Sequence, residues 1–497
     1  MPRSCADPDA GAVAAPTRSL PASASGSASV PAAAAAPAVA PARLDRRVLG
    51  ALALTVVVGA GFRFWGLGAQ RLGFDDAFTT MAARMPLHDL FGYLRAHDSH
   101  PPLDYLLRAP ISHLTTSEWW LRFPSALCSL AALALFAWWM RTRGWLGVVA
   151  TALFAVSSFQ IAHGREIRMY PELELIGVAA AIIAESWLTS PRRWHARVIG
   201  FLAFACLMLH VSGFLLGAGL LVLAGRRTDR EAWRWRRALA FALGAWAVLW
   251  GSSFLTQSRG GHSDWIPHTT PTRLVDTVGR LLTAAPHLLL FVFAAIVAGA
   301  VVLVRADRRL GRVWLCCVAV PIGLAALTGT VAPVLLDRTL TVSTWGAALA
   351  VAYLIDRVAR SSKALGVLVI AVTAVVMVPA AVQAVTRPST PDVALRHLDT
   401  VVAPGDVVTI RPAVKAPELA WSIGPRAHRD LRPADVDRLA NNAAYEVESP
   451  GGAATVPTGR IWLLDWNRRP IEPGFVACAP PWHSGTARIL CLRAAGG

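Results

Sequence analysis

Long apolar segments separated by arginine-containing connections are the feature that most constrains the fold of this chain. A helix needs about 20 apolar residues to cross the hydrocarbon core of a bilayer. Only 16% of the 497 residues are charged, whereas a soluble domain has roughly 25%. We therefore expect an all-α polytopic membrane protein with about eleven spans, namely 48–67, 119–140, 145–161, 171–189, 197–210, 213–225, 238–255, 281–304, 313–331, 339–357 and 364–386.

Arginines fall in alternate connections between these segments and predict the orientation of the chain. The positive-inside rule places connections rich in Lys and Arg in the cytoplasm, which predicts a cytoplasmic N-terminus and an extracytoplasmic C-terminus in the cell membrane. The net charge of +17 follows from these loops, so nucleic-acid binding is excluded as its explanation. The arginines are 43, 46 and 47; 141 and 143; 192, 193 and 197; 226, 227, 230, 234, 236 and 237; 305, 308, 309 and 312; and 357 and 360.

The polar ends of the chain flank this membrane domain, which we place at 46–386. Residues 1–45 are rich in Ala, Pro and Ser and contain no large apolar run, so we expect a disordered cytoplasmic tail. Residues 387–497 are long enough for a small extracytoplasmic α/β or β-rich domain. Its predicted strands are Asp406–Ile410, Arg460–Asp465 and Ala487–Leu492.

Cysteines give one structural expectation and no metal site. Cys478 and Cys491 lie in the polar C-terminal part, where an oxidising compartment permits a disulfide. A Cys-x-x-Cys metal spacing is absent from the sequence.

The first outward loop, about 68–118, contains two adjacent acids, Asp75 and Asp76, soon after the first apolar segment. Adjacent acids at a membrane interface are costly to desolvate and need a reason. They are either a solvated pair at a helix N-terminus, where acids are favoured, or part of a site. The same loop continues with the polar stretch His97-Asp98-Ser99-His100.

A second polar cluster, 163–172, breaks the pattern that fixes the topology. Arg165 and Arg168 fall on the outward side, where arginine should be scarce, with Glu166 and Glu172 beside them. One interpretation is an internal salt bridge. The other is a functional site, because local rules are broken most often where function requires it.

Arg338 is a third outward exception, directly after Asp337. A carboxylate can take a proton from an acceptor hydroxyl, and arginines bind phosphate oxygens in pairs. Acids and arginines around one outward mouth therefore favour sugar transfer from a lipid-linked phosphosugar.

These motifs resemble the GT-C superfamily of glycosyltransferases, specifically the bacterial relatives of protein O-mannosyltransferases in glycosyltransferase family 39. The family's paired acidic motif is matched by Asp75-Asp76. Its His-Pro-Pro-Leu-x-Tyr-Leu-Leu stretch is matched from His100 to Leu107, and its Arg-x-x-Arg-x-Tyr motif by Arg165, Arg168 and Tyr170. The similarity covers about residues 48–190 well and the later helices loosely.

The resemblance implies an inverting enzyme of the cell envelope that uses a polyprenyl-phosphate sugar donor and a glycan, lipid or protein acceptor. It assigns Asp75 as the catalytic base and Asp76 to positioning of acceptor or donor. His100 and Tyr170 would lie at the donor side, Arg165 and Arg168 near the phosphate or bracing Asp75, and Arg338 near the lipid phosphate.

The sequence departs from the family at three positions. The second acid is Asp76 rather than Glu, Asp104 replaces an aromatic or aliphatic residue, and Thr339 stands where Tyr is usual. The sugar and the acceptor are therefore left open. No cofactor is required by the motifs, and a divalent cation is the one open candidate. The alternative function is a polytopic transporter or lipid-linked sugar flippase, which would place ionisable residues mid-helix and show internal repeats.

Overall fold

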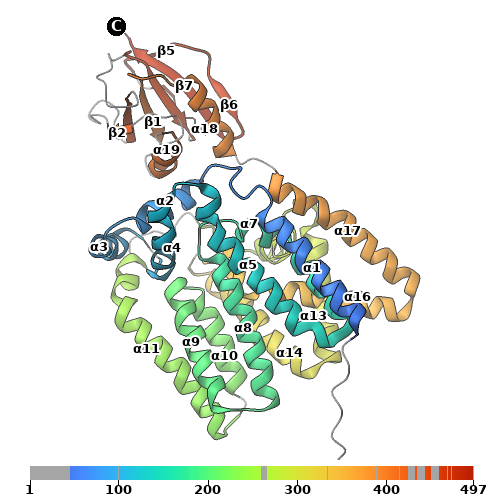
Figure 1. Ribbon diagram of the computed structural model, residues 1–497. Coiled ribbons are helices and arrows are strands. Elements are labelled where there is room, and N and C mark those ends of the chain that lie inside the picture. Colours follow the sequence, from blue (N-terminus) through green and yellow to red (C-terminus); the bar gives the residue numbers. More distant parts are fainter. Residues whose placement is uncertain are drawn as a thin grey trace, which may run out of the picture. The chain divides into compact units, whose positions relative to one another are not determined.

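A bundle of apolar helices forms the larger part of the structure (Figure 1). The computed structural model describes residues 45–495 except 99, 226, 259–265, 333, 387–389, 413–414, 424–430, 434–442, 449–457, 467, 469 and 472. The predicted disordered tail thus lies outside the described residues, apart from Asp45. Each predicted apolar segment overlaps one or more helices of this bundle, and some, such as 145–161, are divided between two.

The helices of the first half of the chain are α1 Arg46–Phe64, α2 Phe74–Ala83, α3 Leu87–His97, α4 Leu103–Leu114, α5 Glu118–Met140, η1 Arg141–Arg143, α6 Gly144–Ala155, α7 Ser158–His163, α8 Tyr170–Thr189, α9 Arg193–Leu209 and α10 Gly213–Gly225. The later helices are α11 Arg230–Ser258, α12 Pro271–Arg280, η2 Pro286–Leu288, α13 Leu289–Ala306, α14 Arg308–Trp314, the π-helical η3 Leu315–Ala319, α15 Val320–Thr328, η4 Arg338–Ser343, α16 Thr344–Ser361, α17 Lys363–Thr386, α18 Thr390–Val401 and α19 Ala416–Ile423.

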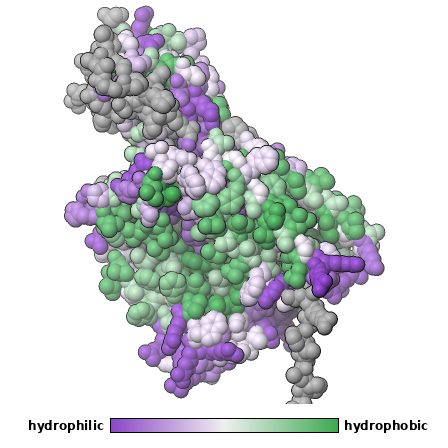
Figure 2. Space-filling view, viewed as in Figure 1, coloured by the Kyte–Doolittle hydropathy of each residue, from purple (hydrophilic) through white to green (hydrophobic). Residues whose placement is uncertain are grey.

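Seven helical stretches among the described residues are long and apolar enough to cross a membrane. The face in Figure 2 shows a broad hydrophobic band over the helical bundle, with hydrophilic residues bordering it. Many large apolar side chains of the bundle are exposed, for example Phe241 and Val248 on α11. A bilayer is the solvent in which such a surface is stable, so the chain is a polytopic membrane protein.

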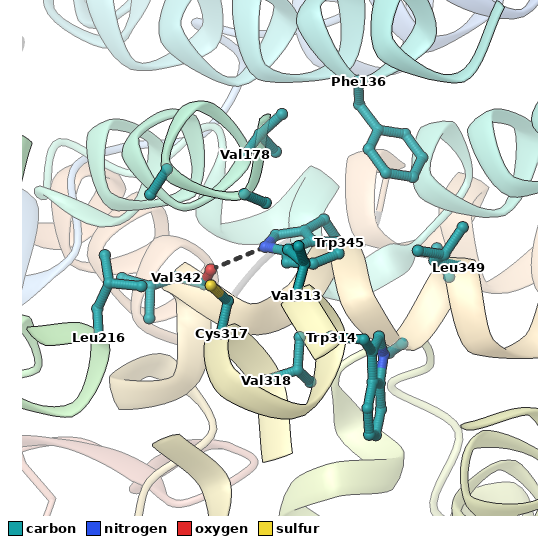
Figure 3. Close-up of a cluster of buried hydrophobic side chains, with 14 of the residues drawn as sticks. Phe136, Val178, Leu216, Val313, Trp314, Cys317, Val318, Val342, Trp345 and Leu349 are labelled. Atoms are coloured by element: carbon teal, nitrogen blue, oxygen red, sulfur yellow. Dashed lines mark hydrogen bonds between the residues drawn. The ribbon is translucent and has the colours of Figure 1, made fainter. Parts of the chain in front are cut away.

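Helix α16 packs against its neighbours in the centre of the bundle. Trp345 is fully buried and donates its indole N–H to the Val342 carbonyl at 3.2 Å (Figure 3). The Trp314 indole N–H donates to the Gly346 carbonyl at 2.8 Å. Glycine allows close approach between helices: a Cβ at Gly177 would lie 2.0 Å from the Val342 oxygen. Small residues at such crossings let membrane helices associate by van der Waals packing.

Residues 68–118, which were predicted to form one long outward loop, contain three helices. Helices α2, α3 and α4 occupy it, and their apolar faces form a separate cluster with Trp246 and Trp250 of α11. That cluster includes Leu90, Leu94 and Tyr105. Packing against α11 gives these short helices the support that isolated helices of 10 to 12 residues lack.

The C-terminal part contains a mixed sheet of seven described strands in the order β2-β3-β1-β4-β7-β5, with β6 pairing with β7. The predicted strands are confirmed as β1 Val407–Arg411, β4 Ile461–Asp465 and β7 Ala487–Ala494. The strands without a sequence prediction are β2 Leu431–Pro433, β3 Ala443–Val447, β5 Phe475–Ala477 and β6 Trp482–Ser484. Helix α18 packs on this sheet in a core of its own, and Cys478 and Cys491 are disulfide-bonded.

Contacts from α18 and α19 reach the residues just before α2. Arg71 donates to Asp399 Oδ2 at 2.5 Å and to the Ser422 carbonyl at 3.2 Å, and its backbone N–H donates to Asp392 at 2.9 Å. Trp421 of α19 packs with Leu72, Ala77, Leu121 and Ile167. The C-terminal part is thereby fixed to the segment that begins α2.

Candidate active site

Helix α2 presents its two acids in opposite environments. It begins after Gly73, and both Asp75 and Asp76 lie in its first turn, where the helix dipole favours negative charge. Consecutive residues point about 100° apart around a helix, so the carboxylates diverge. Asp76 is buried, whereas the Asp75 side chain is 41% exposed.

Two arginines hold the exposed carboxylate, one on each oxygen. Arg168 Nη2 lies 3.1 Å from Asp75 Oδ1, and Arg338 Nη1 lies 3.3 Å from Asp75 Oδ2. Arg168 is itself buried and also donates to Thr79 Oγ1 at 3.1 Å. Burial alone would raise the pKa of Asp75, but the charges of Arg168, Arg338 and His100 outweigh burial and lower it. Asp75 is therefore an accessible, ionised carboxylate beside an excess of positive charge.

Asp76 faces into the protein and joins three segments. Its Oδ2 accepts from Arg122 Nη2 at 3.1 Å, and its Oδ1 accepts from the Ile167 backbone N–H at 2.7 Å. Burial is the main cause that raises the pKa of Asp76. With both oxygens engaged, Asp76 links α2 to α5 and to the turn that carries Arg168, which makes it a support for the Asp75 cluster.

His100 belongs to the same polar group through Asp98. Its Nδ1 lies 2.8 Å from Asp98 Oδ1, and the Tyr105 hydroxyl donates to the other oxygen of Asp98. The His100 ring lies 5.3 Å from the His210 ring, centroid to centroid. Burial would raise the pKa of Asp98, but the neighbouring His100, Arg168 and Tyr105 lower it. His100 is therefore held in place on its Nδ1 side.

Arg165 makes its hydrogen bonds to the end of α1 and does not brace Asp75, one of the two roles expected for it; the other, near the phosphate, stays a prediction. Its guanidinium donates to the carbonyls of Phe62, Trp65 and Gly66 at 3.1, 2.7 and 2.8 Å. The Phe62 carbonyl is in the last turn of α1, and the other two follow it, so Arg165 caps the carbonyl end of that helix. The physical reason is local: 164–169 is a series of turns and bends rather than helix, so residues three apart do not share a face.

Tyr170 begins α8 and is buried. Its ring stands against the His163 ring at a centroid distance of 5.2 Å, and His163 Nδ1 lies 2.9 Å from Glu166 Oε2. The salt bridge expected between Arg165 or Arg168 and Glu166 or Glu172 is not found among the described residues. Glu166 pairs with His163, Glu172 pairs with Arg108, and Arg168 pairs with Asp75. Among the described residues, no hydrogen bond joins Tyr170 to Asp75.

Sequence reasoning missed the arginine that supports Arg168. Arg108 of α4 is fully buried and donates to Asp104 at 3.0 Å, to Glu172 at 2.8 Å and to the Arg168 carbonyl at 2.8 Å. The signal was available, since Asp104 and Arg108 stand four residues apart on a helix. Arg108 also lies in the loop 68–118 that was predicted to face outward, so it is the same kind of exception as Arg168.

The charge of the cluster suits an anion better than a metal ion. Two guanidinium groups face the single Asp75 carboxylate. Among the described residues, groups of three or more His, Cys, Asp or Glu that could hold a metal ion are absent. Arginine guanidinium groups match the oxygens of a phosphate.

No protein-family model and no curated protein matches this chain. Among solved structures, the chain is similar to ArnT from Cupriavidus metallidurans bound to undecaprenyl phosphate, with a TM-score of 0.52, 12% identity and coverage of 90% of this chain and 99% of that chain. The arabinosyltransferase EmbB from Mycobacterium smegmatis gives a TM-score of 0.43 at 14% identity, over 64% of this chain and 31% of that one.

The S. cerevisiae protein O-mannosyltransferase Pmt1-Pmt2 complex, bound to its sugar donor, gives a TM-score of 0.34 at 19% identity, over 43% of this chain. This chain spans 34% of the yeast chain's length. The match to ArnT extends over nearly the whole of both chains and carries the assignment of the fold. The chain has the GT-C fold of membrane glycosyltransferases.

Proposed function

We propose that this protein is a membrane glycosyltransferase that moves a sugar from a polyprenyl-phosphate donor to an acceptor hydroxyl on the outer face of the cell membrane. Asp75 is its general base, and the sugar carbon is inverted. The observation that carries the proposal is the exposed Asp75 carboxylate between Arg168 and Arg338. The fold shared with ArnT, which was solved with undecaprenyl phosphate bound, supports the class of donor.

The reaction is a single displacement. Asp75 takes the proton of the acceptor hydroxyl while the hydroxyl oxygen forms a bond to C1 of the donor sugar. The bond between C1 and the phosphate oxygen breaks, and its electron pair stays on that oxygen. Polyprenyl phosphate leaves, and Arg168 and Arg338 stabilise the charge that develops on it.

Donor binding should make Asp75 a stronger base, because Arg168 and Arg338 lower its pKa only while they face it. A donor phosphate competes for Arg168 and Arg338, which lower the pKa of Asp75 in the empty site. As the phosphate neutralises them, the pKa of Asp75 rises toward its ordinary value. A base works best when its pKa approaches the working pH, so donor binding activates the site.

The bilayer, a polyprenyl-phosphate sugar and a glycan, lipid or protein acceptor are the partners of this function. We place the N-terminus and the arginine-rich connections in the cytoplasm, and α2, the Asp75 cluster and 387–497 outside. A cysteine introduced at Thr272, an exposed residue in the first turn of α12, tests this orientation. Thr272→Cys reacts with an impermeant thiol reagent in intact cells, and labelling that needs lysis would reverse the topology.

Charged side chains inside the bundle keep a transporter or flippase as the competing function. Arg63 donates to Ser129 at 2.9 Å, and Ser129 donates to Glu174 at 3.2 Å. Buried ionisable groups in membrane helices often mark transport pathways. Arg63 is in the last turn of α1 and Glu174 is near the start of α8, so both charged members lie near helix ends, while Ser129 lies in the middle of α5.

The test incubates purified protein in vesicles with a panel of polyprenyl-phosphate sugars. The expected result is release of polyprenyl phosphate together with transfer of the sugar to an acceptor or to water. A protein that moves the intact lipid-linked sugar across the vesicle, and cleaves none of the panel, is a flippase and not a transferase.

A further inference from the structure

A lysine from the C-terminal part stands at the edge of the Asp75 cluster. Lys415 Nζ lies 5.4 Å from the ring centroid of Phe74, the residue before Asp75, and 5.5 Å from that of Trp466. An ammonium group over aromatic faces is held by their quadrupoles while keeping its charge available. Burial would raise the pKa of Asp75, and Lys415 joins Arg168, Arg338 and His100 in lowering it.

Glu418 forms an ion pair with that ammonium, and it is fully buried. Its Oε2 lies 3.9 Å from Lys415 Nζ, which is within ion-pair range and too long for a hydrogen bond. Within the described part of the chain, neither oxygen of Glu418 has a hydrogen-bond partner. A buried carboxyl in this state is costly, and a bound ligand with donor groups would relieve the cost.

Helix α19 is held rigidly enough to place these side chains. Trp421 packs into the apolar cluster formed with Leu72 and Ile167, and the Arg84 guanidinium lies 4.6 Å from the centre of its ring. Arg71 donates to the Ser422 carbonyl at 3.2 Å. Lys415 and Glu418 are therefore fixed relative to the beginning of α2 and to Asp75.

We propose that Lys415 is a third phosphate-binding cation of the donor site and that Glu418 is the residue that positions it. The inference rests on the proposed function. Arg168 and Arg338 face the Asp75 carboxylate, and Lys415 faces Glu418, whose pKa burial raises to about 7, so the cluster has a net positive charge. A sugar phosphodiester carries one negative charge, which offsets part or all of it. In this arrangement the C-terminal part completes the active site.

The chain offers an internal reference for a direct test, because Lys363 and Lys415 are its only lysines. Lys363 begins α17 and is exposed. Full-length protein is treated with an amine-acylating reagent, and the acylation of each lysine is measured by peptide mass spectrometry. Polyprenyl phosphate is expected to slow acylation of Lys415 at least fivefold and to leave Lys363 unchanged. Polyprenol, which lacks the phosphate, is expected to protect neither.

Protection by inorganic phosphate at the same concentration would show a free-phosphate site, and protection only by the lipid phosphate would show that the prenyl chain helps to anchor the donor. Both outcomes support a phosphate site at Lys415. Equal acylation of Lys415 with and without every phosphate overturns the proposal.

Kinetics separate this role from a structural one. Lys415→Met is expected to raise the donor KM about tenfold with kcat nearly unchanged, and Lys415→Arg to restore most of the loss. Glu418→Gln is expected to raise the donor KM less and to leave kcat and the melting temperature unchanged. Lys363→Met is the matched control and behaves as the wild type. An unchanged donor KM in Lys415→Met contradicts the proposal.

A failure of the proposed function is distinguishable from a failure of this inference. If wild-type protein cleaves no donor, the proposed transferase activity is wrong, while protection of Lys415 by polyprenyl phosphate still reports the phosphate site. If wild-type protein is active and Lys415 is neither protected nor required, only this inference is wrong.

Discussion

Asp75 and Asp104 stand in the first turns of α2 and α4, and each faces arginine, yet they occupy opposite environments. The Asp75 side chain is 41% exposed and shares two arginines. The Asp104 side chain is 2% exposed and pairs with Arg108, which also binds Glu172. The same residue types thus make an accessible, cation-rich group in one helix and a closed structural network in the next. The two aspartates therefore differ in burial and not in residue type, and burial is what assigns the proposed catalytic role to Asp75 and a structural role to Asp104.

The largest effect is expected from Asp75→Asn. The amide cannot accept the acceptor proton, so turnover at saturating donor falls by a factor of about 10² to 10⁴. Because the Asp75 side chain is 41% exposed and its ion pairs are reached by solvent, thermal stability changes little. Initial rates and melting curves of the purified variant measure both. Asp89→Asn, an exposed acid of α3 paired with His88, is the control, and a near wild-type rate in Asp75→Asn removes Asp75 as the base.

Asp104→Asn is expected to show the reverse pattern. Removing one carboxylate from a buried ion-pair network leaves Arg108 undercompensated, which costs about 3 kcal/mol of stability. Denaturation in detergent measures this loss. Any fall in activity should be recovered at a temperature where the variant is folded. If Asp104→Asn is as stable as the wild type but inactive, Asp104 has a functional role and is not only a structural residue.

Arg338→Ala sharpens the comparison on the side of the exposed cluster. Loss of one charge-assisted contact to the donor phosphate is worth about 1.5 to 3 kcal/mol, so the donor KM should rise at least tenfold. Arg165→Ala is the matched control, since Arg165 closes α1 and does not face Asp75. A larger change of donor KM in Arg165→Ala than in Arg338→Ala would reverse the roles of these arginines.

The smallest effect is a displacement of the pH–rate profile. The ionised form of Asp75 is the active one, and arginine charge lowers its pKa, so kcat/KM should stay on its plateau below the pH at which an ordinary Asp becomes protonated. In Arg338→Ala the acid limb should move to higher pH. In the wild type, the acid limb of kcat should also lie above that of kcat/KM, because the bound donor draws the arginines from Asp75. If the acid limbs of wild-type kcat/KM, wild-type kcat and Arg338→Ala kcat/KM coincide, the arginines do not move from Asp75 to the donor phosphate.

Much of the helical architecture could be predicted because membrane spans are encoded by local composition. The helices of the first loop were missed, since α2, α3 and α4 are amphipathic and owe their stability to packing on α11. Strands β1, β4 and β7 were predicted from their apolar runs. The three-residue strands β2, β5 and β6 were not, because their pairing is decided by the neighbouring strand rather than by their own sequence.

The site shows the same division. Asp75, Arg168 and Arg338 could be selected as polar exceptions on the outward side, and the structure brings all three together. Which of several outward arginines reaches Asp75 depends on turns between helices, and this separates Arg165 from Arg168. Lys415 was visible as one of two lysines, but 340 residues of chain separate it from Asp75, and only folding shows their proximity.

The bond network from Arg71 to α18 and α19 has a consequence for the order of biosynthesis. Ribosomes deliver α1 and α2 to the membrane first, and the segment that covers them emerges last, after every helix of the bundle. Until Asp392, Asp399 and Trp421 arrive, the beginning of α2 has no partner on that side. A nascent chain that has not yet reached α18 and α19 therefore lacks these contacts to the beginning of α2.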